Sequence, residues 1–166
     1  MGKCGIEMSD LLLTQNRIYI IQTLYALDIR LSVIESNGKA YSEEDILQII
    51  QDTLSVEQID EEEIKKLIVI ITKITNDIMI IDQYISKYLS NSWKIERLAK
   101  VLLAILRSAT FEIINKPSQK LGTIINDYIE ITRSFEHHSE ASFINAILDN
   151  IAKEVMSSAD IQKTSA

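Results

Sequence analysis

Glycine and proline are scarce in this chain, which contains four Gly and one Pro among 166 residues. Gly2 and Gly5 lie at its start, so the strong chain breakers of the remainder are Gly38, Gly122 and Pro117. Strand-rich folds and phosphate-binding loops need the tight turns that glycine and proline provide. No P-loop and no Gly-x-Gly-x-x-Gly motif fits these positions. The sequence therefore excludes the nucleotide-binding enzymes that are built on such loops.

Apolar residues, isoleucine above all, recur three or four positions apart instead of alternating. This spacing is typical of amphipathic helices, because it places the apolar side chains on one face. Ser42, followed by three acidic residues, also has the pattern of a helix N-cap. The predicted helices cover residues 10–32, 42–52, 60–89, 98–115, 121–134 and, in the last case, Phe143 to Val155. We expect an all-α chain with short connections.

The length of 166 residues fits one domain or two very small ones. A chain of this size buries enough surface to fold without disulfides or a metal. Cys4 is the one cysteine, so no disulfide can form within the chain and a cysteine metal cluster is excluded. The most apolar stretch, 67–81, is interrupted by Lys73 and Asp77 and is too short to span a bilayer. We expect a cytoplasmic protein without a membrane segment.

The formal net charge of −7 is not spread evenly along the chain. Residues 1–40 carry four basic and four acidic side chains, and residues 91–166 carry nine of each. Residues 41–90 carry four basic and eleven acidic side chains, so the whole excess comes from this middle third. An acidic total that comes from one region leaves the two ends of the chain open to a nucleic-acid partner.

The side chains that could support metal binding or catalysis do not form a linked pattern. His137 and His138 lie between Glu136 and Glu140, but two adjacent histidines point in different directions and no third ligand has a suitable spacing. The acidic run 61–63 is typical of a helix N-terminus. No nucleophile, base and orienting group occur together. We expect no metal, no cofactor and no enzymatic activity.

Two arginines and two aromatic residues each allow two interpretations. Arg17 and Arg107 lie inside strongly apolar helices, where an arginine requires either a carboxylate partner or an anionic ligand. The sequence does not choose between these. Trp93 and Tyr25 could stack on bases, but single aromatic side chains in helical stripes more often belong to the core.

Several segments carry recognisable residue patterns in a fixed order. They are R-I-Y-I-I-Q-T-L-Y at 17–25, W-K-I-E-R-L at 93–98, A-I-L-R-S-A-T-F-E at 104–112, I-N-D-Y-I-E-I at 125–131 and F-I-N-A-I-L-D-N-I-A at 143–152. In order and spacing these segments resemble those of the NusB family of transcription antitermination factors. The acidic middle third is similar to the family only in being helical.

This resemblance implies an all-α fold of about seven helices in two small helical bundles packed across each other. It implies one domain over 1–166, with helical subdomains at about 10–90 and 91–157 and a frayed tail at 158–166. It also implies a function: members of the family bind the boxA element of nascent RNA together with NusE, a ribosomal small-subunit protein. The pair joins an antitermination complex on RNA polymerase and supports transcription of ribosomal RNA.

The resemblance implies a set of RNA-binding residues. In the family an arginine-rich run precedes the Q-A-L-Y motif, whereas the run 13–17 of this chain keeps only Arg17, with Lys3 farther upstream. Phe143 matches an aromatic residue that can stack on a base, although it also fits the apolar stripe of the last helix. Asn145 matches a family asparagine that either caps backbone groups internally or binds a ligand. The candidate RNA-binding residues are Arg17, Lys3, Phe143 and Asn145.

Leu102 and Leu103 replace an acidic and basic pair that is usual in the family. Two leucines in place of two charges predict an apolar surface patch, which would serve a homodimer or an altered contact with NusE. Together with Tyr25 they are the candidate protein-contact residues. The alternative to RNA binding is therefore a helical protein-interaction module, homodimeric or NusE-binding, in which RNA binding is weakened or lost.

Overall fold

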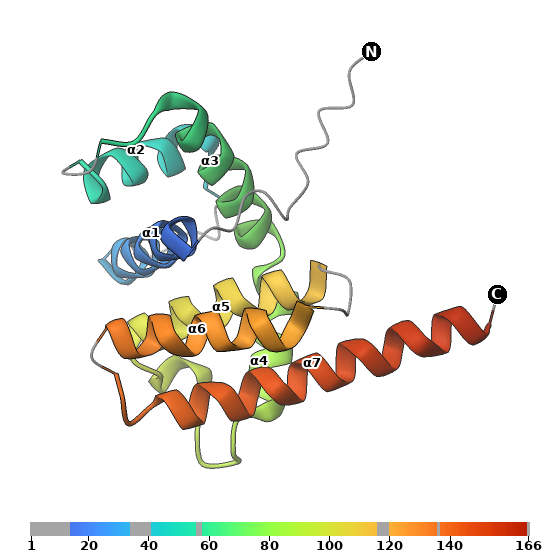
Figure 1. Ribbon diagram of the computed structural model, residues 1–166. Coiled ribbons are helices and arrows are strands. Elements are labelled where there is room, and N and C mark those ends of the chain that lie inside the picture. The colour runs from blue at the N-terminus through green and yellow to red at the C-terminus, as the bar shows by residue number, and fades with distance from the viewer. Residues whose placement is uncertain (1–13, 34–40, 56–57, 116–119, 136, 166) are drawn as a thin grey trace. The chain divides into compact units, whose positions relative to one another are not determined.

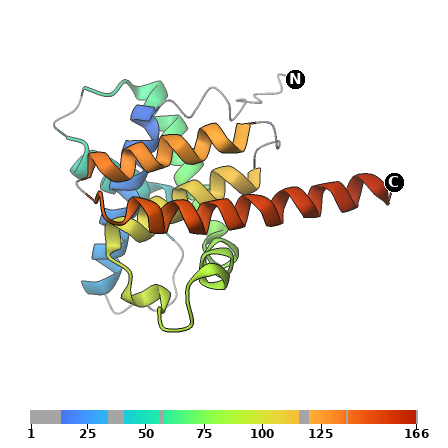
Figure 2. The ribbon, with the colours of Figure 1, turned by 60° about the horizontal axis from the view of Figure 1, so that its bottom comes forward.

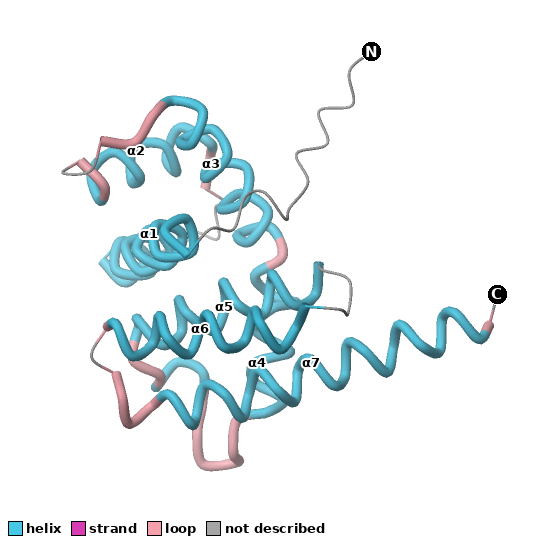
Figure 3. Tube along the Cα trace, viewed as in Figure 1, coloured by secondary structure: helices cyan, strands magenta, loops and turns pink. Residues whose placement is uncertain are grey.

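The computed structural model describes residues 14–33, 41–55, 58–115, 120–135 and 137–165 (Figure 1). Within these residues there are helices and loops and no strand (Figure 3). The helices are α1 (Thr14–Val33), α2 (Glu43–Thr53), α3 (Glu61–Asn76), α4 (Ile78–Tyr88), the short 3₁₀ helix η1 (Ile95–Arg97), α5 (Lys100–Asn115), α6 (Leu121–Ser134) and α7 (Ala141–Thr164). The predicted all-α fold with about seven helices is confirmed.

The chain divides into two compact units, which we call unit 1 (Met1–Thr75) and unit 2 (Asn76–Ala166). The sequence places the subdomain boundary near residue 90 and predicts one helix over 60–89. That helix is in fact two, because α3 ends at Asn76 and α4 begins at Ile78. Asp77 lies between them, and its carbonyl accepts a hydrogen bond from Ile81 at 3.0 Å. The apolar spacing continues across this short break, so it gives no signal of an interruption.

The helix starts of unit 1 follow from local hydrogen bonds. Ser42 Oγ accepts from the backbone N–H of Asp45 at 3.1 Å, and the Asp45 carboxylate accepts from the Ser42 N–H at 3.0 Å. This capping box confirms the predicted N-cap of α2. Asp60 accepts in the same way from the backbone N–H of Glu63 at 2.8 Å and so precedes α3. The Glu63 side chain in turn accepts a hydrogen bond from Asn16 of α1.

Isoleucine fills most of the interior. Among the described residues, 19 of the 36 buried apolar side chains are isoleucines, so residues with modest helix propensity form the helices here. Burial therefore holds these helices in place more than intrinsic propensity does. In unit 1 the buried isoleucines of α2 and α3 are Ile46, Ile49, Ile50, Ile70, Ile71 and Ile74.

Helix α5 is the central helix of unit 2, because it contacts α4, α6 and α7. Arg107 of α5 donates two hydrogen bonds to the Asp82 carboxylate of α4, from Nε at 2.8 Å and from Nη2 at 2.7 Å. Of the two interpretations of Arg107, the carboxylate partner is thus the one found. On another side of α5, the Tyr128 hydroxyl of α6 lies 2.9 Å from Ser108 Oγ and 2.9 Å from Glu112 Oε2.

Helix α7 extends past the other helices of unit 2 at its C-terminal end (Figures 1 and 2). Glu154 attaches it to α4 by accepting hydrogen bonds from Lys87 Nζ at 2.7 Å and from the Tyr88 hydroxyl at 2.6 Å. Both hydrogen bonds lower the pKa of Glu154 below its ordinary value, and the bond from Lys87 has the larger effect. The segment 158–166, expected to be frayed, is helical as far as Thr164. No helix among the described residues is both long and apolar enough to cross a membrane.

Candidate nucleic-acid interface

The first turns of α7 present two of the predicted RNA-binding residues, Phe143 and Asn145. Successive residues of an α-helix are turned by about 100° around its axis. Ser142 and Ala146 therefore lie on one face of α7, and both are exposed. Phe143 lies to one side of this face and Asn145 to the other. This exposed start of α7 has one flank that carries an aromatic side chain and another that carries an amide.

The aromatic flank contains a pair of rings. The ring centroids of Phe143 and Trp93 are 6.2 Å apart, and the ring planes are inclined by 44°. Phe143 is half-buried, whereas Trp93 is 52% exposed. The prediction that Trp93 belongs to the core is therefore wrong. Trp93 follows the breaker Ser90-Asn91-Ser92 and precedes η1, so it was never part of a helical stripe.

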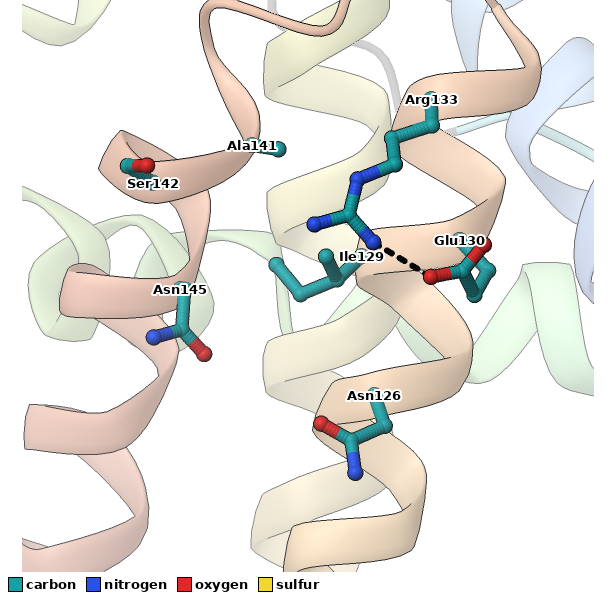
Figure 4. Close-up of a pocket in the computed structure, with 7 residues that line it drawn as sticks. All are labelled: Asn126, Ile129, Glu130, Arg133, Ala141, Ser142 and Asn145. Carbon is teal, nitrogen blue, oxygen red and sulfur yellow. Dashed lines mark hydrogen bonds and ion pairs between the residues drawn. The ribbon is translucent and has the colours of Figure 1, made fainter.

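The amide flank borders a cavity of about 290 Å³ between α6 and α7 (Figure 4). In Figure 4 the Asn145 side chain extends from α7 toward this cavity, and Asn126 and Arg133 extend toward it from α6. Arg133 is ion-paired with Glu130 on its own helix. Neither amide side chain has a hydrogen-bond partner within the part of the chain that the structure describes. The complete lining is Asn126, Ile129, Glu130, Arg133, Ala141, Ser142 and Asn145.

The polar residues of α6 were not singled out from the sequence, although they leave a recognisable signal. Asn126, Glu130 and Arg133 follow one another at steps of four and three, so they form one polar stripe on a helix whose other faces are apolar. That stripe predicts a solvated face. What it faces depends on where α7 packs, and that is a tertiary property.

The loop before α7 contains the two histidines. His137 Nδ1 lies 3.6 Å from Glu140 Oε2, and Ser139 Oγ donates a hydrogen bond to the same carboxylate oxygen at 2.6 Å. The hydrogen bond from Ser139 is the main cause that lowers the pKa of Glu140. Glu140 makes no side-chain cap for α7, and the backbone N–H of Ala141 instead donates to the His138 carbonyl at 3.4 Å. A group of three or more His, Cys, Asp or Glu suitable for a metal is absent from the described residues.

Two acidic side chains near the exposed start of α7 have cationic neighbours, whereas Glu140, which directly precedes the helix, lies beside Ser139 and His137. Glu130 pairs with Arg133, and Asp149 pairs with Lys153 at 2.8 Å. The two units also differ in charge, because unit 1 has seven Lys and Arg against thirteen Asp and Glu, and unit 2 has ten against eleven. Six of the seven excess negative charges thus belong to unit 1, and the surface around Phe143 and Asn145 is in the nearly neutral unit 2.

The other two predicted RNA-binding residues are Arg17 and Lys3, and Arg17 belongs to α1 of unit 1. Arg17 is only 5% exposed and has an interaction partner within the protein, so its contact with RNA stays a prediction. The buried face of α1 is broader than one apolar stripe and includes Asn16 and Arg17 as well as the isoleucines beside them. Lys3 lies outside the described residues. The internal cap considered for Asn145 is not formed, which leaves ligand binding as the prediction for this residue.

The predicted protein-contact residues differ among themselves. Leu102 is 6% and Leu103 is 4% exposed, so the apolar surface patch expected from them is wrong. Both belong to α5, eleven of whose sixteen residues are buried, and the leucines extend that buried surface instead of opening a new one. The homodimer hypothesis therefore loses the patch on which it depended. Tyr25 is 43% exposed and stays a candidate for contact with a protein.

Comparison with known proteins identifies one family. A family model described as the NusB family matches residues 14–153. The transcription antitermination protein NusB of Clostridium tetani is 34% identical over 117 residues, which cover 68% of this chain and 76% of that protein. Its counterpart in Bartonella tribocorum is 29% identical over 139 residues, 84% of this chain and 86% of that protein. The solved structure of T. maritima NusB has a TM-score of 0.68 at 28% identity, over 85% of this chain and 90% of that one.

A second solved structure adds evidence for the fold. A chain in the structure described as a plectonemic RNA supercoil has a TM-score of 0.70 at 21% identity, over 87% of this chain and 96% of that chain. At this identity the likeness concerns the arrangement of the helices alone.

Proposed function

The chain belongs to the NusB family, and we propose that it acts in transcription antitermination by binding boxA-type single-stranded RNA together with NusE. In this role the pair joins the antitermination complex on RNA polymerase. The contribution of the protein is binding, without a chemical step. NusE, the ribosomal small-subunit protein, docks on the helical surface and completes the site for the RNA.

The observation that carries the proposal is the exposed start of α7. Single-stranded RNA is recognised by stacking of splayed bases on aromatic side chains and by hydrogen bonds to the edges of the bases. Phe143 and Trp93 supply an aromatic pair with one ring exposed, and Asn145 supplies an amide at the border of a polar cavity. Both kinds of contact are thus available within the first turn and a half of one helix.

The charges around this helix start are compatible with a polyanion. The backbone N–H groups in the first turn of α7 have no side-chain cap from Glu140, and the positive end of the helix dipole lies there. Of the nearby acidic residues, Glu130 and Asp149 are paired with Arg133 and Lys153, whereas Glu140 accepts a hydrogen bond from Ser139. An RNA strand therefore meets no unpaired carboxylate at Glu130 or Asp149.

The burial of Arg17 sets an expectation for affinity. Because this arginine is 5% exposed, the segment that is rich in arginine in the family contributes little phosphate neutralisation here. Each phosphate contact of a single strand contributes about 0.7 to the slope of log affinity against log salt. We therefore expect weak binding by the protein alone with a shallow salt dependence, and much stronger binding when NusE supplies further contacts.

The test is a titration of a fluorescently labelled boxA-type RNA, followed by anisotropy, with this protein, with NusE and with both. We expect the mixture to bind more tightly than either protein, and Phe143→Ala to weaken the mixture by roughly 5- to 150-fold, the loss of about 1–3 kcal/mol of stacking. A scrambled RNA of equal length is the control for sequence preference. Absence of any enhancement by NusE would contradict the proposal.

The burial of Arg17 also favours a second candidate, a helical protein-interaction module that binds NusE and no longer binds RNA. The same titration separates the two functions, because the second predicts a NusE complex with no affinity for RNA at any salt concentration. Analytical ultracentrifugation of the two proteins without RNA shows whether that complex forms.

A further inference from the structure

We propose that the cavity between α6 and α7 holds one nucleobase of the bound strand, while a neighbouring nucleotide stacks on Phe143 and Trp93 on the other side of α7. This inference depends on the RNA binding proposed above and goes further by assigning two separate nucleotides to two flanks of one helix. It gives a role to Asn126, for which the sequence provided none.

The size of the cavity suits a single base. Its volume of about 290 Å³ is at the lower end of the range of small-molecule sites, which runs from roughly 300 to 1,000 Å³. Ile129, which is 8% exposed, supplies an apolar contact at the cavity, against which a planar ring can pack. A planar group of one or two rings fits such a space, whereas a larger ligand would extend into solvent.

The hydrogen-bonding groups of the cavity suit the edge of a base. Asn126 on α6 and Asn145 on α7 border it from opposite helices, and each amide offers one acceptor and two donor hydrogens. An asparagine amide can form a paired donor and acceptor contact with a base edge, as it does with adenine. Neither amide is engaged with another described residue, so both are available to a ligand without breaking an existing bond.

The charge of the cavity favours a base over a phosphate group. Arg133 and Glu130 are its charged residues, and they are paired with each other, so the cavity is close to neutral. A phosphate is held best where donors and positive charge are in excess. A neutral and polar cavity is better suited to an uncharged ligand that both donates and accepts hydrogen bonds.

The surface of α7 between the two flanks leaves a path for the strand. The exposed residues there are Ser142 and Ala146, and both side chains are small. A strand that crosses the helix at this point lies close to its backbone and reaches Phe143 on one side and Asn145 on the other. The helix with its side chains is about 10–12 Å wide, and small side chains make the crossing shorter.

The inference is tested with RNAs in which one nucleotide at a time is replaced by an abasic nucleotide, titrated against the complex of this protein with NusE. In the wild-type complex we expect one position at which removal of the base weakens binding about tenfold or more. The complex with Asn145→Ala should bind the unmodified RNA as weakly as the wild-type complex binds the RNA that lacks this base. In Asn145→Ala the abasic change at this position has no further effect. Phe143→Ala removes the sensitivity of a neighbouring position. Asn150→Ala, an exposed asparagine of α7 outside the cavity, is the matched control.

Three results would contradict the inference. If the complex binds RNA but Asn145→Ala shows the same abasic profile as Asn150→Ala, the cavity does not hold a base, and the proposed function stands without it. If Asn145→Ala weakens binding of NusE in the absence of RNA, the cavity is a protein contact and the inference is overturned. Failure of the wild-type complex to bind any RNA would overturn the proposed function together with the inference.

Discussion

Tyr128 places its hydroxyl in a polar cluster that is closed to solvent. Tyr128 is 0% exposed, and its partners Ser108 and Glu112 are 2% and 1% exposed. The hydroxyl donates to Glu112 Oε2 at 2.9 Å and lies 2.9 Å from Ser108 Oγ. Tyr128→Phe removes it and leaves the buried carboxyl and the serine each with one bond fewer. A hydrogen bond to a charged group is worth about 1.5–3 kcal/mol and one to a neutral group about 0.5–1.5 kcal/mol. We expect a loss of about 2 kcal/mol in the free energy of unfolding.

The assay is urea unfolding followed by circular dichroism. With a slope of about 2 kcal/mol per molar urea, a loss of this size lowers the midpoint by about 1 M. In thermal unfolding it lowers Tm by roughly 4–8 °C for a chain of this length. The matched control is Tyr84→Phe on α4, a half-buried tyrosine whose hydroxyl makes no hydrogen bond within the described residues. We expect the control to change the free energy by less than about 0.5 kcal/mol.

The reasoning is refuted if Tyr128→Phe is as stable as Tyr84→Phe. A double-mutant cycle with Glu112→Gln provides a second measurement, because the two changes should be non-additive if the two side chains interact in solution. Such coupling would connect α6 to α5 at the helix that also bears Asn126 and Arg133. Additive effects would show that the Tyr128 hydroxyl and the Glu112 carboxyl do not interact in solution.

Two further predictions concern ion pairs of α4. Arg107→Lys keeps the charge but loses one of the two hydrogen bonds to Asp82. We therefore expect the free energy of unfolding to fall by about 1 kcal/mol and the RNA affinity to change less than twofold. A large loss of RNA affinity would mean that Arg107 binds an anionic ligand. Hydrogen bonds, of which that from Lys87 has the largest effect, lower the pKa of Glu154. The ionised carboxylate therefore stabilises the fold at a pH above its ordinary pKa, and this contribution is lost as the pH falls through the lowered pKa. The difference in urea midpoint between the wild type and Glu154→Gln should therefore be present at neutral pH and disappear between about pH 5 and about pH 3, and a difference that does not change with pH would contradict this.

The existence of the helices could be predicted because burial of one face imposes a spacing of three and four, and Ile20, Leu24 and Leu27 show it directly. Two helix boundaries could not be predicted, the break between α3 and α4 and the C-terminal end of α7. A one-residue break at Asp77 leaves the spacing of the flanking isoleucines unchanged. At the other end, the residues after Val155 carry no apolar stripe, yet adding residues to an existing helix is much easier than starting one, so α7 continues to Thr164.

The candidate site could be predicted in part. The resemblance to the family identified Phe143 and Asn145, which lie on the exposed start of α7. It did not predict that Arg17 and Leu102 are buried, because a stripe in one sequence does not show how wide the buried face of a helix is. That width depends on how many helices surround it. The cavity needs two helices that are adjacent in space, and no pattern within one helix can reveal it.

Glu154 has a consequence for the rotation of α7. It lies eleven residues after Phe143, about 16 Å farther along the helix axis. The buried face of α7, which includes Ile144, Ile147 and Ile151, sets how far the helix is turned about its own axis, and the bonds of Glu154 to two consecutive residues of α4 add to this constraint. A turn by the angle of one residue would remove Phe143 from Trp93 and Asn145 from the cavity. The orientation of these side chains is thus supported in part from several turns away, so a substitution at Glu154 can affect what the start of the helix recognises while every residue there stays the same.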